Sequence, residues 1–103
     1  ELLGLNDKFE KLIEVNYKPA ENNYYLGDML FKRKKYDQAI VHFKKSAMLN
    51  DKASYMPTLL LNSAISFENT KDKDNAKNFY STLIELYPNS QEAKTAKTNL
   101  NKL

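Results

Sequence analysis

The chain has 103 residues, of which 42% are apolar and 28% charged, and its formal net charge is +3. This balance is typical of a globular domain with one modest core. No apolar run approaches the roughly 20 residues of a membrane-spanning helix, and the absence of cysteine excludes disulfides, thiolate chemistry and a zinc ribbon. With two glycines and three prolines, the sequence favours long helices over β-hairpins and Gly-rich phosphate loops.

Apolar residues recur at helical spacing along the chain, and this pattern predicts six helices. We expect them near residues 2–15, 20–34, 36–49, 54–70, 72–87 and 90–102. Several breaks have local causes. The residue before Pro19 resists the α region, and Pro57 suits a first helical turn, where its missing N–H costs little. Asp72 is a good N-cap, as is Asn89 or Ser90 for the last helix.

The chain contains an internal repeat. Segments 39–43 and 76–80 each place an alanine four residues before an aromatic residue, and they lie 37 residues apart. The same offset pairs Gly27 with Ala64, and a fainter copy upstream places Phe9 34 residues before Phe43. Antiparallel helices approach closely only where one presents a small side chain. We therefore expect four small residues at helix contacts: Gly27, Ala39, Ala64 and Ala76.

These residues resemble the tetratricopeptide repeat, in which Leu-Gly is followed by an alanine, an aromatic residue four positions on, and a proline. The matches are Leu26-Gly27, Ala39 and Phe43 in one repeat, and Ala64, Ala76, Tyr80 and Pro88 in the next. Departures are Asn23 in place of Trp, Ser63 in place of Leu and Asp51 in place of Pro. The resemblance implies an all-α, right-handed array of antiparallel helical hairpins. We expect one domain over 1–103, with a half repeat (1–19), two repeats (20–52 and 53–89) and a capping helix (90–103).

A narrower resemblance covers residues 22–100, which are similar to the C-terminal repeat domain of the YbgF/CpoB family of periplasmic Tol–Pal proteins. It rests on Tyr24-Tyr25-Leu26-Gly27-Asp28, on Tyr36-Asp37-Gln38-Ala39-Ile40 with Phe43, and on Tyr87-Pro88-Asn89-Ser90 with Ala93 and Ala96. The Tyr-Pro-x-Ser expected near residues 49–52 is replaced, and the family's coiled coil is not present in the chain. The resemblance implies a periplasmic module that binds TolA and coordinates envelope constriction with wall synthesis during division. The alternative is a scaffold subunit of an outer-membrane assembly lipoprotein or secretion system.

Catalytic candidates are scarce. His42 is the sole histidine and precedes a packing aromatic, which favours a surface or half-buried bystander. Asp72 and Asp74 are expected at a helix start, where the dipole attracts carboxylates without any metal. The basic run 32–35, with Lys44 and Lys45, fits a solvated helix end better than a nucleic-acid or lipid site, because no aromatic platform accompanies it. We therefore expect no enzyme activity, cofactor, metal, nucleic-acid partner or direct membrane insertion.

The first helix of each pair lines the concave face in tetratricopeptide folds, so its side chains are the candidates for binding a protein partner. The predicted groove comprises Tyr24, Tyr25, Asp28, Phe31 and Lys32 from one repeat and Leu61, Asn62, Ile65 and Asn69 from the next. Tyrosine suits interfaces because it joins apolar area to a polar tip. For Tyr25, packing between repeats remains an equal alternative. The apolar stripe of segment 2–15 lacks a preceding helix, and an uncovered face there would allow self-association.

Overall fold

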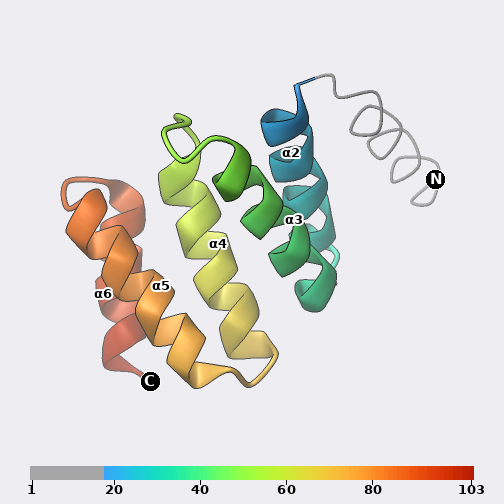
Figure 1. The fold of residues 1–103 in the computed structure, drawn as a ribbon. Coiled ribbons are helices and arrows are strands. Elements are labelled where there is room, and N and C mark those ends of the chain that lie inside the picture. The colour runs from blue at the N-terminus through green and yellow to red at the C-terminus, as the bar shows by residue number, and fades with distance from the viewer. Residues whose placement is uncertain (1–17) are drawn as a thin grey trace. The chain divides into compact units, whose positions relative to one another are not determined.

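The computed structural model describes residues 18–103, which form five α-helices without any β-strand (Figure 1). Their bounds are α2 Pro19–Lys32, α3 Tyr36–Leu49, α4 Met56–Asn69, α5 Lys73–Leu86 and α6 Gln91–Asn101. The all-α fold class is confirmed, and every bound lies within two residues of its predicted position. The helix expected near residues 2–15, with its uncovered stripe, lies outside the described residues.

The chain forms two compact units, residues 1–51 and 52–103. The described part of the first unit is the α2–α3 pair, and the second unit contains the α4–α5 pair with α6. The predicted boundary between the two full repeats, at residues 52 and 53, lies next to this division. The assignment of the whole chain to a half repeat, two repeats and a capping helix stays a prediction.

The second helix pair repeats the first at a constant distance along the sequence. α2 begins at Pro19 and α4 at Met56, whereas α3 ends at Leu49 and α5 at Leu86, so both differences are 37 residues. The other two bounds of each pair follow the same offset. The 37-residue period predicted from a few landmarks therefore holds for the full length of both helices.

The turns inside the two pairs also match. Lys34 and Lys71, at equivalent positions, both adopt the left-handed region with φ of 63° and 66°. In the first turn the N–H of Lys35 donates to the Leu30 carbonyl at 2.8 Å, and the equivalent bond in the second turn measures 2.9 Å. This is a Schellman motif, which usually places glycine where these lysines stand.

Helix starts follow the predicted chemistry. Pro19 is the first residue of α2 and Pro57 the second of α4, where a missing N–H leaves no helical bond unmade. Asp72 caps α5 by accepting a hydrogen bond from the N–H three residues on at 3.2 Å. Ser90, rather than Asn89, caps α6, because its hydroxyl oxygen accepts from the N–H of Ala93 at 3.0 Å.

Close packing of α2 on α3 depends on a glycine. A Cβ built on Gly27 would lie 2.7 Å from Cδ1 of Phe43 and 3.3 Å from the Ala39 carbonyl oxygen. Phe43 is fully buried, so its ring occupies the space that any side chain at position 27 would need. The other small residues predicted at helix contacts, Ala39, Ala64 and Ala76, are also fully buried.

In the second unit, α6 is joined to both helices of the pair. The buried Tyr80 on α5 donates its hydroxyl hydrogen to the Glu68 carboxylate on α4 and accepts from Asn99 Nδ2 on α6 at 3.1 Å. Thr58 on α4 donates to the carboxylate of Glu92 on α6 at 2.9 Å. These bonds hold α6 against both α4 and α5.

Candidate partner-binding site

The first five residues of the predicted groove all lie on α2, at spacings that place them on neighbouring turns. Tyr25 is 50% exposed, whereas Tyr24, Asp28 and Phe31 are half-buried. The exposed Lys32 reaches back one turn, and its Nζ lies 2.9 Å from Oδ2 of Asp28. Because this ion pair is on the surface, it contributes little to stability.

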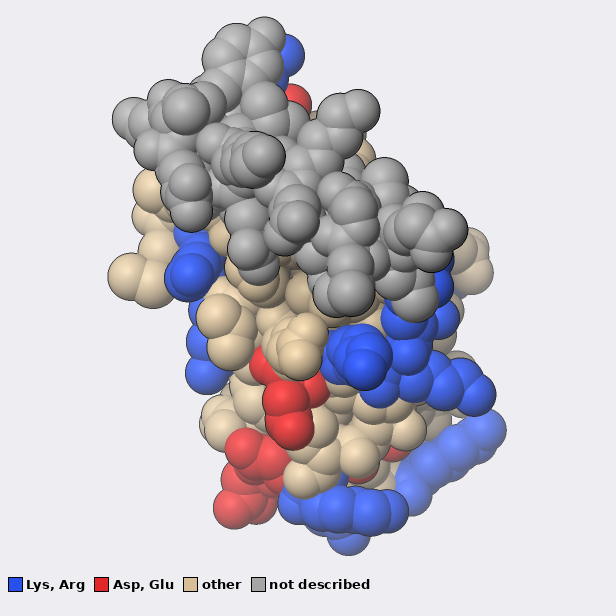
Figure 2. All heavy atoms as spheres, turned by 90° about the vertical axis from the view of Figure 1, so that its right-hand side faces the viewer, with Lys and Arg blue, Asp and Glu red and all other residues tan. Residues whose placement is uncertain are grey.

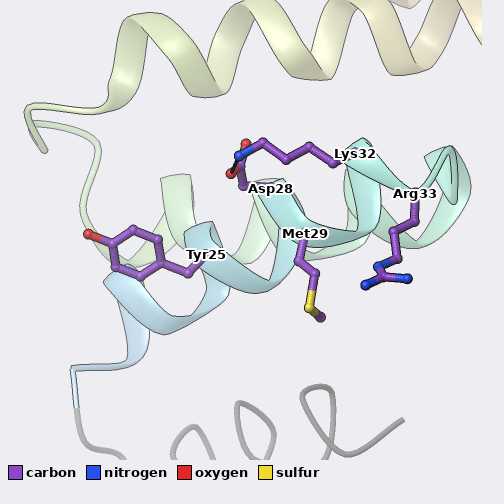
Figure 3. Close-up of a pocket in the computed structure, with 5 residues that line it drawn as sticks. All are labelled: Tyr25, Asp28, Met29, Lys32 and Arg33. Atoms are coloured by element: carbon purple, nitrogen blue, oxygen red, sulfur yellow. Dashed lines mark ion pairs between the residues drawn. The ribbon is translucent and has the colours of Figure 1, made fainter. Parts of the chain in front are cut away.

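A cavity of about 350 Å³ lies along this helix (Figure 3). Among residues 18–103, its lining consists of Tyr25, Asp28, Met29, Lys32 and Arg33. Three of these residues were predicted, whereas Met29 and Arg33 were missed. The signal for them was the four-residue step from Tyr25 to Met29 to Arg33, which places all three on successive turns of one face. In the close-up, the ion-paired side chains of Asp28 and Lys32 extend from a different side of α2 than the side chains of Met29 and Arg33.

Tyr24 and Phe31 also help to pack the first helix pair. The Tyr24 ring centroid lies 6.2 Å from that of the buried Phe43, and the Phe31 ring meets Tyr36 edge-on at 5.9 Å. Truncation of either ring would therefore disturb the α2–α3 contact as well as the predicted groove. Tyr25 contacts Tyr24, at 5.4 Å between centroids, and is the most exposed aromatic residue of the set.

The remaining predicted residues lie on α4, at positions equivalent to those on α2. Leu61, Asn62 and Ile65 are half-buried, and Asn69 is exposed and donates from Nδ2 to the Ile65 carbonyl at 2.8 Å. They belong to the second unit, whereas the α2 set belongs to the first. A continuous groove formed by both sets stays a prediction.

The sequence candidates for catalysis have structural roles. Asp72 caps α5, and its second carboxylate oxygen accepts from Nδ2 of Asn75 at 2.7 Å. His42 is half-buried, with Nδ1 3.0 Å from Oδ1 of Asn23. Among residues 18–103, no group of three or more His, Cys, Asp or Glu side chains is arranged to hold a metal ion.

A second cavity, of about 270 Å³, lies in the second unit and was not predicted. It is lined by Glu68, Lys71, Lys73 and Leu103. Glu68 is the carboxylate that accepts the hydroxyl hydrogen of Tyr80. Burial and this hydrogen bond raise the pKa of Tyr80 above its ordinary value of 10.0, so the phenol stays protonated and keeps donating. The Glu68 carboxylate therefore has a structural role, because this hydrogen bond joins α4 to α5.

Comparison with known families supports the repeat assignment. A family model described as tetratricopeptide repeat matches residues 58–90, which run from the first turn of α4 to the cap of α6. The match and the two equivalent helix pairs support a tetratricopeptide repeat domain, a class of protein-interaction module. A search of curated proteins gives no match. None of the described helices is long and apolar enough to cross a membrane.

Proposed function

We propose that the protein is a protein-binding scaffold module of the bacterial cell envelope, in which the first helix of each pair receives a segment of the partner. The observation that carries the proposal is the cavity along α2, at which Tyr25 stands half-exposed. Protein-binding sites draw most of their affinity from a few aromatic and arginine side chains. Tyr25 and Arg33, two turns apart at one cavity, are side chains of these types.

The site suits a peptide that places an apolar side chain against Met29, between the polar side chains of the cavity. Met29 supplies a flexible apolar wall, and methionine adapts its shape to different ligands. The ion pair of Lys32 with Asp28 neutralises both charges at the rim. Among residues 18–103, the other cationic side chain at the cavity is Arg33, and a guanidinium there favours an acidic group on the peptide.

For the partner and the compartment, we propose TolA and the periplasm, with a role in coordinating envelope constriction during cell division. The support is the motif resemblance over residues 22–100, including Tyr24-Tyr25-Leu26-Gly27-Asp28 on α2. The alternative is a scaffold subunit of an outer-membrane assembly or secretion complex, which uses the same kind of groove with a different partner.

Calorimetric titration of the chain with a purified TolA-type protein tests both levels of the proposal. Tyr25→Ala should weaken binding by about 2 kcal/mol, or some thirtyfold in Kd, because it removes an aromatic anchor. Tyr25→Phe keeps the ring and should retain most of the affinity. Lys97→Ala, an exposed change on α6, is the control on the opposite end of the sequence and should leave Kd unchanged.

The outcomes separate the site from the partner. Since Tyr25 is half-exposed, Tyr25→Ala should change the melting temperature little, so lost binding would not reflect unfolding. If Tyr25→Ala binds as tightly as the unmodified chain, the α2 cavity is not the site. If the unmodified chain fails to bind the TolA-type protein, the Tol–Pal assignment is wrong and the other envelope assemblies become the targets.

A further inference from the structure

The outer face of α3 differs from the predicted groove and carries exposed apolar and basic side chains together. We define this face by Asp37, Val41, Lys44, Lys45 and Met48, whose spacing places them on one side of a helix. All five are exposed, with Val41 at 49% and Met48 at 87%. The residues that α3 buries lie on the opposite side of the helix.

The equivalent face of α5 provides an internal control for this observation. At the 37-residue offset it presents Asp74, Asn78, Ser81, Thr82 and Glu85. All five are exposed as well, and none is apolar. The same helix pair therefore folds with polar side chains at these positions, so Val41 and Met48 are not needed for packing. Leu49 is not part of the argument, because its counterpart Leu86 is equally exposed.

We propose that the outer face of α3 docks an amphipathic helix of a protein partner, with apolar residues on Val41 and Met48 and acidic residues beside Lys44 and Lys45. Val41 and Met48 lie two turns apart, about 10 Å along the axis, which matches apolar residues seven positions apart on a partner helix. The lysines lie between them along the sequence, where they select against a basic or uncharged helix.

Charge supports an acidic partner. Residues 18–51 contain seven Lys or Arg and four Asp or Glu. On the side of the molecule seen in Figure 2, basic side chains lie at the right, the bottom and the left of the described surface, and acidic ones lie from its centre to the lower left. Asp37 at one end of the face repels an anionic lipid surface, whereas a protein helix can place a basic residue opposite it. The mixture of charges thus favours a protein over a membrane.

The test exchanges the outer faces of α3 and α5. One variant carries Val41→Asn, Lys44→Ser, Lys45→Thr and Met48→Glu, and the reciprocal variant adds Asn78→Val, Ser81→Lys, Thr82→Lys and Glu85→Met to it. The probe is a synthetic helical peptide of about four turns with leucines seven positions apart and glutamates beside them. A charge-reversed peptide with lysines in place of the glutamates is the matched control.

We expect the acidic peptide to bind the unmodified chain and to bind the first variant at least about tenfold more weakly. The reciprocal variant should regain binding, with chemical shift changes at α5 instead of α3. Circular dichroism should give the same helicity for all three chains, because each face replaces an exposed one. Vesicles of phosphatidylglycerol should fail to sediment the chain.

Three results would overturn the proposal. Equal binding of the acidic peptide to the unmodified chain and the first variant would exclude the outer face of α3. Equal binding of both peptides would exclude the role of Lys44 and Lys45. Sedimentation with the vesicles, without peptide binding, would assign the face to an anionic membrane. None of these results depends on Tyr25 or the α2 cavity, so they are independent of the proposed groove.

Discussion

The two helix pairs have the same backbone plan and different interiors. Where the first pair has Asn23, His42 and Ser46, the second has Leu60, Phe79 and Leu83 at the 37-residue offset. Asn23 is only 1% exposed, so its amide is as deeply buried as the leucine that replaces it. Equal helix lengths and equal turns therefore do not require equal interiors. The common features are the small residues at the helix contacts and the Schellman turns.

In the first pair, hydrogen bonds take the place of apolar contacts. Asn23 donates from Nδ2 to the Pro19 carbonyl at 2.9 Å, so its Oδ1 is an acceptor and His42 Nδ1 donates to it at 3.0 Å. Ser46 donates from Oγ to the Ala20 carbonyl at 2.7 Å. Two side chains of α3 thus bond to the N-terminal part of α2, whose N-cap Lys18 makes no side-chain cap bond.

In the second pair, aromatic packing replaces this network. The rings of Phe67 and Phe79 lie 5.0 Å apart between centroids. The second pair has a polar defect of its own, since the buried hydroxyl of Ser63 has no hydrogen-bond partner in the described structure. An apolar interior stabilises by removing area from water, whereas a buried polar network stabilises only while every member is satisfied. The first pair should therefore be the more sensitive to single substitutions.

The largest expected effect on the free energy of unfolding comes from replacing polar interior residues of the first pair, one at a time, by their counterparts in the second pair. His42→Phe should destabilise the chain by about 1–3 kcal/mol, because it leaves the buried Oδ1 of Asn23 without its donor. Adding Asn23→Leu should recover most of this loss, because replacement of both polar partners by apolar groups is nearly neutral. Urea denaturation of the two single variants and the double variant gives the coupling energy. Additive effects would mean that the two side chains act independently.

The next effect concerns Gly27, for which the second pair has Ala64. Alanine is favoured over glycine inside a helix by about 1 kcal/mol, but overpacking of a core costs about 1–3 kcal/mol. A Cβ at position 27 would lie 2.7 Å from Cδ1 of the buried Phe43, so the cost of overpacking is larger than the gain in helix propensity. Gly27→Ala should therefore lower the free energy of unfolding by about 1 kcal/mol. The matched change Ala64→Gly should also destabilise, and a stabilised Gly27→Ala would show that the ring moves aside.

The sequence predicted the elements that repeat and missed the interactions that do not. Helix bounds, the 37-residue offset and the small residues follow from local patterns, and the structure confirms them. The polar contacts of Asn23 and Ser46 could not be predicted, because such residues are mostly exposed and their partners lie 19 and 26 positions away. In the candidate site, Met29 and Arg33 were not predicted, although the four-residue step places them on the face of α2 that Tyr25 occupies.

Substitutions in the turns should have a smaller effect of opposite sign, because they should raise the free energy of unfolding. Lys34 and Lys71 hold the left-handed conformation that glycine adopts without strain. Lys34→Gly and Lys71→Gly should each raise the free energy of unfolding by about 0.5–1 kcal/mol, since the strain relief exceeds the entropy of a freer unfolded chain. Equal gains at both sites would confirm that the turns are equivalent in energy as well as geometry. A loss at one site would mean that the lysine side chain stabilises that turn.

The smallest expected effect is a pH dependence confined to the first pair. Burial and, to a lesser degree, the positive charge of Lys45 lower the pKa of His42 below its ordinary value of 6.5. The unfolded chain therefore takes up this proton at a higher pH than the folded chain, so the free energy of unfolding falls as pH decreases through about 6.5. It levels off below the folded pKa.

The effect stays small because Nδ1 of His42 already carries the hydrogen that it donates to Asn23. The added proton enters at Nε2, and the bond between the helices survives. His42 is the sole histidine, so no other side chain with an ordinary pKa titrates between about pH 5 and 8. Urea denaturation across this interval should give a sloped curve for the unmodified chain and a flat one for the double variant His42→Phe, Asn23→Leu. Parallel curves would show that His42 does not link the stability of the first pair to pH.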